Sequence, residues 1–229
     1  MVLYWRGRGK EVRGIVFTGG EGPPPGLCRN ILREAGETLV VAADAGLGAC
    51  EQAGVEAAWV IGDMDSLDDE RRLDRYAGRI VRHRPDKDYT DTELALVFLR
   101  EHGAGGIWII GGGGGRTDHL LALAALFERR EKPERWITGR EDIRFLGAGT
   151  ERFFPLTRPG CPVSVFPLGE PPWEAESRFL RWPLTGLAWN RGFFSISNEL
   201  AEGNTAGGFY LRAIRGGFLV LTPFPGYSF

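Results

Sequence analysis

Long hydrophobic runs are absent from this chain of 229 residues. The longest wholly apolar run, 120–127, is far shorter than the stretch of about 20 residues that a membrane-spanning helix needs. The first residues, 1–6, contain no apolar core of the kind that a signal peptide requires. We therefore expect a cytoplasmic protein with no membrane partner.

A marked excess of either charge is also missing. The chain carries 28 basic and 30 acidic side chains, which gives a formal net charge of −2. Proteins that bind nucleic acid usually show a clear positive excess, so we expect no nucleic-acid partner. A local basic pocket remains compatible with this balance.

Cysteine is scarce. Cys28, Cys50 and Cys161 are odd in number, lie far apart in the sequence and never form Cys-x-x-Cys. This pattern indicates reduced thiols of a cytosolic protein, which fill the core more often than they bind a metal.

Short apolar runs alternate with amphipathic stretches over residues 1–145. The apolar runs are almost continuously hydrophobic, as in strands covered on both faces. Alternating strands and helices predict a parallel sheet between helical layers, a three-layer α/β domain. The expected strands are 12–17, 38–42, 58–61, 80–83 and 106–110, and the expected helices are 26–35, 46–53, 68–76, 90–102 and 118–130.

The pattern changes after about residue 145. Proline and aromatic residues become frequent, and the apolar runs 163–166, 193–196 and 218–221 are short, with turn residues between them. No helical period is visible. We therefore predict two domains, an α/β domain over 1–145 and a smaller all-β, sandwich-like domain over 146–229.

Acidic residues follow several of the expected strands. Asp63 and Asp65 lie two residues apart after strand 58–61, so in an extended segment their carboxylates point to the same side. Two facing carboxylates repel each other unless a cation lies between them, and oxygen ligands favour Mg²⁺. An ordinary acidic turn is the alternative. Asp44 follows strand 38–42 at the same edge, either as a helix N-cap or as a further acid of the site.

A second acidic segment follows strand 80–83. Thr90 and Glu93 have the spacing of a helix capping box, which accounts for both residues structurally. Three further acids surround one lysine, more than the single acid that compensation of a helix dipole explains. This combination predicts a site for a metal ion and a phosphate. The residues are Asp86, Lys87, Asp88 and Asp91.

Five consecutive glycines, 111–115, separate the last expected strand from the last expected helix. Their unobstructed N–H groups form a suitable anion cradle, and Arg116 adds a guanidinium for phosphate oxygens. The segment is neither a Walker A loop nor the fingerprint Gly-x-Gly-x-x-Gly, which disfavours a nicotinamide oxidoreductase. For His119 we favour a hydrogen bond within the first helical turn over a catalytic role.

Taken in order, these blocks resemble the signature of the thiamine pyrophosphokinase family, and the C-terminal part resembles that family's second domain. The resemblance covers nearly the whole chain, and the blocks are specific as a set. One block departs from the usual Asp-Gly-Gly-Ala-Asn, because Asp44 is followed here by Ala-Gly-Leu-Gly. The matching segments are 43–46, 62–66, 86–91, 114–119, 180–184, 192 and 196–199.

The resemblance implies transfer of a diphosphate from ATP to the hydroxyl of thiamine, with Mg²⁺, to give thiamine diphosphate and AMP. It also implies a homodimer whose active sites lie between the α/β domain of one subunit and the β domain of the other. Catalysis would rest on Asp44, Asp63, Asp65, Asp91 and Arg116, with Asp63, Asp65 and Asp91 as metal ligands. The implied nucleotide contacts are Lys87, Asp88, Gly113, Gly114, Gly115, Arg116 and Asp118, and the implied thiamine contacts are Trp182, Ser197 and Asn198.

Two alternatives remain open. A diphosphokinase for another heterocyclic alcohol, such as a hydroxymethylpterin, would keep the same acids and differ around Trp182 and Ser197. A non-catalytic sensor of nucleotide or thiamine would fit the altered block after Asp44, although retention of the three other acids argues against it.

Overall fold

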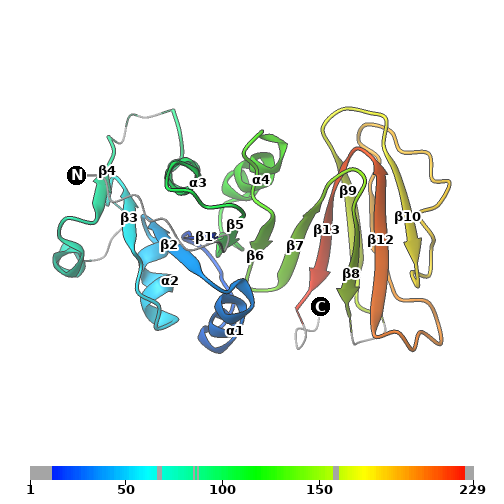
Figure 1. Ribbon diagram of the computed structural model, residues 1–229, viewed down its shortest axis with the longest axis horizontal. Coiled ribbons are helices and arrows are strands. Elements are labelled where there is room, and N and C mark those ends of the chain that lie inside the picture. Colours follow the sequence, from blue (N-terminus) through cyan, green and yellow to red (C-terminus); the bar gives the residue numbers. More distant parts are fainter. Residues whose placement is uncertain (1–11, 66–68, 85, 87, 157–159, 225–229) are drawn as a thin grey trace. The chain divides into compact units, whose positions relative to one another are not determined.

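The structure is a computed structural model that describes residues 12–65, 69–84, 86, 88–156 and 160–224 (Figure 1). The chain divides into two compact units, Met1–Gly139 and Arg140–Phe229. The domain boundary indicated by the sequence, after residue 145, falls inside a strand of the second unit. No helix among the described residues is long and apolar enough to cross a membrane.

A parallel sheet with the strand order β6-β5-β1-β2-β3-β4 forms the centre of the first unit. Its inner strands are buried along most of their length, because helices cover both faces. Helices α1 and α2 lie on one face, and α3 and α4 lie on the other (Figure 1). The strands are β1 (Arg13–Phe17), β2 (Thr38–Ala43), β3 (Trp59–Gly62), β4 (Ile80–Arg82), β5 (Ile107–Ile110) and β6 (Arg135–Ile137).

The helices of this unit follow local sequence signals. Helix α3 begins with a complete capping box, in which Thr90 Oγ1 accepts from the N–H of Glu93 and the Glu93 carboxylate accepts from the N–H of Thr90. The predicted capping box is thus confirmed. The helices are α1 (Pro25–Ala35), α2 (Gly46–Gln52), α3 (Asp91–Glu101) and α4 (Thr117–Ala125).

Three local expectations need correction. The segment predicted as a helix over 68–76 is a 3₁₀ helix, η1 (Glu70–Tyr76), whose buried side chains Leu73 and Tyr76 are three residues apart, the repeat of that helix. The last expected helix ends at Ala125 and continues as a short 3₁₀ turn, η2 (Leu126–Glu128). Strand β6 was not expected, because a run of three residues carries too little periodicity.

The second unit contains two antiparallel sheets, with the strand orders β11-β9-β13-β7 and β10-β12-β8. Side chains of both sheets form one core, so the unit is sandwich-like. None of its described residues is helical. The strands are β7 (Glu141–Leu146), β8 (Glu151–Pro155), β9 (Val163–Leu168), β10 (Glu174–Arg178), β11 (Ser195–Asn198), β12 (Gly208–Arg215) and β13 (Gly217–Pro223).

The predicted fold class, an α/β unit followed by an all-β unit, is confirmed. Two of the three expected apolar runs lie within β9 and β13. The third was placed too early, since β11 begins only at Ser195, and Phe193 lies in a turn where its N–H donates to the Asn190 carbonyl.

Candidate active site

One pocket of about 370 Å³ opens at the carboxyl ends of the first unit's strands. This is the edge at which open α/β sheets bind ligands. Its walls are formed by the loops after β1, β2 and β5, by the first turn of α3, and by α4 as far as the start of the 3₁₀ turn that follows it. The lining residues are Thr18, Gly19, Gly20, Ala43, Asp44, Ala45, Thr90, Asp91, Thr92, Gly112, Gly114, Gly115, Arg116, His119, Ala122, Leu123 and Leu126.

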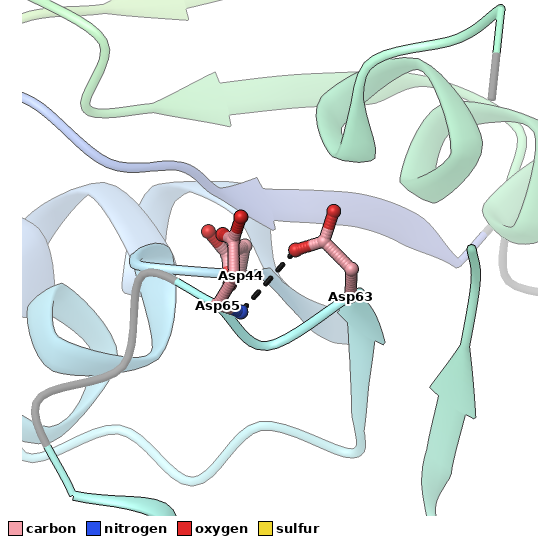
Figure 2. Close-up of side chains that lie close together, drawn as sticks. All are labelled: Asp44, Asp63 and Asp65. Atoms are coloured by element: carbon pink, nitrogen blue, oxygen red, sulfur yellow. Dashed lines mark hydrogen bonds between the residues drawn. The ribbon is translucent and has the colours of Figure 1, made fainter. Parts of the chain in front are cut away.

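Three carboxylates gather beside this pocket. Asp44 comes from the end of β2, whereas Asp63 and Asp65 come from the loop after β3 (Figure 2). Each offers an oxygen, and these oxygens lie within 4.8 Å of one another. The convergence of separate loops that the sequence argument required is therefore present.

A turn, rather than an extended segment, brings Asp63 and Asp65 together. Met64 between them adopts a φ of 69°, the left-handed region that L residues rarely occupy, and its side chain is buried. The N–H of Asp65 donates to Asp63 Oδ1 at 3.3 Å (Figure 2). The expectation of an extended segment was therefore wrong.

Asp44 is the acid best placed to receive a cation. Its Oδ1 is buried, and among the described residues it has no hydrogen-bond partner. A buried carboxylate oxygen is costly unless a cation or a donor compensates it. Three convergent carboxylates supply oxygen ligands of the kind that Mg²⁺ prefers, so this donor set fits such an ion.

Asp91, the first residue of α3, borders this cluster across Gly62. A side-chain carbon at Gly62 would lie 3.2 Å from Asp91 Oδ1 and 3.1 Å from Asp44 Cβ. Gly62, with a φ of 151°, therefore allows the two acids to approach each other. The 4.8 Å group of described acids contains Asp44, whereas the family resemblance implies Asp91 as the third metal ligand.

The glycine loop is less open than its sequence indicates. The N–H of Gly112 donates to the Gly19 carbonyl at 2.9 Å, and the N–H of Gly113 donates to the Glu21 carbonyl at 2.9 Å. Within the described part of the chain, the N–H groups of Gly114 and Gly115 have no acceptor. The expectation that all five N–H groups are available was therefore wrong.

Arg116 lines the pocket and is already paired. Its guanidinium donates to both carboxylate oxygens of Asp118, with Nη2 at 2.6 Å from Oδ2. This bidentate contact holds the pKa of Asp118 below its usual value. Both side chains are exposed, so a phosphate could displace Asp118 from the guanidinium with little loss of stability.

Three predicted nucleotide contacts are not among the residues that line the pocket. They are Gly113, Asp118 and the exposed Asp88. Lys87 lies outside the described residues, so its predicted role stays a prediction.

The predicted thiamine contacts belong to the second unit. The Trp182 side chain is exposed, and the guanidinium of Arg181 lies over its ring at 4.8 Å. Asn198 is only 2% exposed, and its amide bonds the backbone of Trp182 twice, accepting from the N–H at 3.2 Å and donating to the carbonyl at 2.7 Å. Ser197 adopts a φ of 57° beside it.

Sequence reasoning missed the loop after β1 and the role of Thr92 as a wall of the pocket. Thr18, Gly19 and Gly20 follow the first expected strand at its carboxyl end, so the rule applied to the other strands would have found them.

Comparisons with known proteins agree with these motifs. The family model described as the catalytic domain of thiamin pyrophosphokinase matches residues 32–137. The thiamine pyrophosphokinase of Bacillus subtilis is 29% identical over 169 residues, which cover 71% of this chain and 78% of that protein.

Solved structures with the same fold include thiamine pyrophosphokinases of two bacteria and one yeast. The Bacillus subtilis structure has a TM-score of 0.74 at 24% identity and covers 94% of this chain and 100% of its own. The Geobacillus thermodenitrificans structure has a TM-score of 0.71 at 22% identity and covers 95% of this chain and 100% of its own. The Candida albicans structure has a TM-score of 0.71 at 13% identity and covers 94% of this chain and 90% of its own. The resemblance seen in the motifs is thus confirmed: the chain is similar in sequence and in fold to thiamine pyrophosphokinases.

Proposed function

We propose that this protein is a thiamine diphosphokinase, which transfers a diphosphate from ATP to the hydroxyl of thiamine and releases AMP. One observation carries the proposal: Asp44, Asp63 and Asp65 converge within 4.8 Å, and Asp44 lines the same pocket as Gly114, Gly115 and Arg116. A cation site facing a phosphate site is what diphosphate transfer from a nucleotide needs.

Asp44, Asp63 and Asp65 would hold Mg²⁺, with Asp91 bordering the ion or its water shell. The ion, when bound, supplies positive charge to the phosphate oxygens of the nucleotide. The loop geometry also contributes, because the turn at Met64 and the small Gly62 hold the acids in place before the substrate arrives. The chain therefore provides a preorganised site rather than one assembled on binding.

Gly114, Gly115 and Arg116 would bind the phosphate chain of the nucleotide. The N–H groups of Gly114 and Gly115 have no acceptor among the described residues, and they precede the N-terminus of α4. Both features favour an anion. Arg116 would exchange the Asp118 carboxylate for phosphate oxygens, so the observed ion pair holds the guanidinium at the pocket until the nucleotide binds.

In the transfer, the oxygen of the thiamine hydroxyl bonds to the β-phosphorus. The bond between that phosphorus and the oxygen bridging to the α-phosphorus breaks, and AMP leaves with the bridging oxygen. The hydroxyl proton would pass to a carboxylate that does not hold the ion, and Asp91, which lines the pocket and only borders the ion, is placed for this role. Arg116 would stabilise the charge that grows on the leaving oxygen.

Thiamine carries a fixed positive charge and aromatic rings, so the exposed face of Trp182 is a suitable surface for it. Asn198 would act indirectly by fixing the backbone of Trp182. The homodimer and the cytoplasmic location are further parts of this proposal. The homodimer rests on the family resemblance, and the location rests on the cysteine pattern.

The test is a product analysis with ATP, Mg²⁺ and thiamine. We expect AMP and thiamine diphosphate in equal amounts, and at least about 100-fold slower formation of both by the Asp63→Asn variant. Formation of ADP would contradict diphosphate transfer. A reaction with a hydroxymethylpterin but not with thiamine would identify the other diphosphokinase, and binding of both ligands without any product would identify a sensor.

A further inference from the structure

Two buried threonines meet in the wall of the pocket. Thr18 follows β1, and Thr92 is the second residue of α3, yet their Oγ1 atoms are only 2.7 Å apart. The two side chains are 8% and 6% exposed, and both belong to the pocket lining. The small exposed part of each therefore faces the space in which the proposed nucleotide would lie.

The proton count of this pair leaves one donor unused. Each hydroxyl carries one proton, and the single hydrogen bond between them consumes one of the two. Among the described residues, neither hydroxyl has a further partner. A buried donor without an acceptor is unfavourable, so the second proton calls for an acceptor in the pocket.

The surroundings fix the position of the Thr18 hydroxyl. The N–H of Thr18 donates to the Ile110 carbonyl at 3.0 Å, and its methyl group lies against Gly112, where a side-chain carbon would come within 3.3 Å. The methyl group thus packs on the glycine loop while the hydroxyl points to Thr92. A donor held in this way loses little rotamer freedom when a ligand binds.

We propose that the Thr18–Thr92 hydroxyl pair donates a hydrogen bond to a phosphate oxygen of the bound nucleotide. This inference rests on the proposed function and adds two nucleotide-binding residues to it. The pair lies on the same pocket as Gly114, Gly115 and Arg116, which are donors as well. A further donor suits an anionic phosphate, whereas the cationic thiamine would call for an acceptor.

A double-mutant cycle separates ligand binding from packing. The variants Thr18→Val, Thr92→Val and the double variant are compared by melting temperature and by the Kd of a non-hydrolysable ATP analogue with Mg²⁺. Each single variant strands one buried hydroxyl, so we expect a lower melting temperature. The double variant strands none, and its melting temperature should return toward that of the parent protein.

Nucleotide affinity should not return in the same way. Loss of a hydrogen bond to a charged group weakens binding about 10-fold or more. We therefore expect the double valine variant to bind the ATP analogue about 10-fold or more weakly than the parent protein. Thiamine affinity should remain unchanged. The double variant Thr18→Ser with Thr92→Ser keeps both hydroxyls and should bind the analogue like the parent protein.

Thr222→Val is the matched control. Thr222 is also 8% exposed and lies in the second unit, where its hydroxyl donates to the Asp142 carbonyl. We expect this variant to melt earlier with unchanged nucleotide affinity.

Parent-like affinity in the valine double variant would overturn the inference. So would a loss of affinity in the serine double variant, since packing and not the hydroxyls would then be responsible. The proposed function fails on a different result, namely that the parent protein forms no AMP from ATP and thiamine. The two failures are distinguishable because the affinity measurement needs no turnover.

Discussion

The acidic cluster of the first unit and the Trp182–Asn198 segment of the second unit match the family pattern in different ways. In the cluster, Asp44 Oδ1 is buried without a hydrogen-bond partner among the described residues. In the second unit, the Asn198 amide is committed to the backbone of Trp182 at both ends. Asp44 Oδ1 is thus available to a ligand, whereas Asn198 supports the chain.

This difference has an energetic counterpart. Convergent carboxylates repel each other, so the cluster costs stability in the absence of a cation. The buried amide of Asn198 satisfies backbone groups and therefore stabilises the fold. Substitutions in the cluster should change activity more than stability, and substitution of Asn198 should do the reverse.

The largest effect is expected at the cluster. Asp63→Asn removes a charged ligand while keeping the side-chain shape. AMP formation should fall by at least about 100-fold, because mutation of residues that only support the metal ligands already lowers metal affinity or activity about 10- to 100-fold. The melting temperature should stay the same or rise. Asp74→Asn, at an exposed acid of η1, is the control and should leave both unchanged. Activity of Asp63→Asn within a few-fold of the parent protein would refute the metal role.

Arg116→Met comes next. It removes the guanidinium at the mouth of the pocket, and kcat/KM for ATP should fall about 10- to 100-fold, because charged contacts to phosphate are worth more than neutral ones. The melting temperature should hardly change, since the pair with Asp118 is exposed. Steady-state kinetics with ATP varied would show this, and an unchanged value would place the phosphate site elsewhere.

Asn198→Ala tests the other side of the comparison. It leaves two backbone groups of Trp182 without their partner, so the free energy of unfolding should fall by about 1–3 kcal/mol. Urea unfolding followed by tryptophan fluorescence measures this. If stability is unchanged while the KM for thiamine rises strongly, Asn198 contacts the substrate instead.

Trp182→Ala should have the smallest effect. Half of this side chain is exposed, so stability should change little. The KM for thiamine should rise by about 3- to 30-fold, the range expected for loss of a stacking and cation–π surface. Trp182→Phe, which keeps an aromatic face, should recover part of the affinity. Equal KM values in all three proteins would remove Trp182 from the thiamine site.

Strand–helix alternation was enough to predict that Asp44, Asp63 and the glycine loop meet at one edge, because parallel strands bring their carboxyl ends together. The exact grouping was not predictable. It depends on the left-handed turn at Met64 and on the space left by Gly62, and neither has a signature in the sequence alone.

Long-range pairing limited the rest of the site prediction. The Gly113 N–H is consumed by Glu21, a residue more than ninety positions earlier in the chain, so local sequence could not show that this donor is occupied. The hydrogen bonds between Asn198 and Trp182 also join residues 16 positions apart, too far for a local pattern to show them. Side-chain hydrogen bonds across elements decide which motif residues remain available to a ligand.

The central claim, a divalent cation held by Asp44, Asp63 and Asp65, is tested most directly by anomalous X-ray diffraction. Crystals grown with Mn²⁺ and a non-hydrolysable ATP analogue should show one strong peak about 2.0–2.4 Å from oxygens of these side chains, the range of hard-cation coordination. The peak should be lost in Asp63→Asn. A Mn²⁺ ion bound elsewhere, with the three carboxylates contacting only protein or water, would contradict the account.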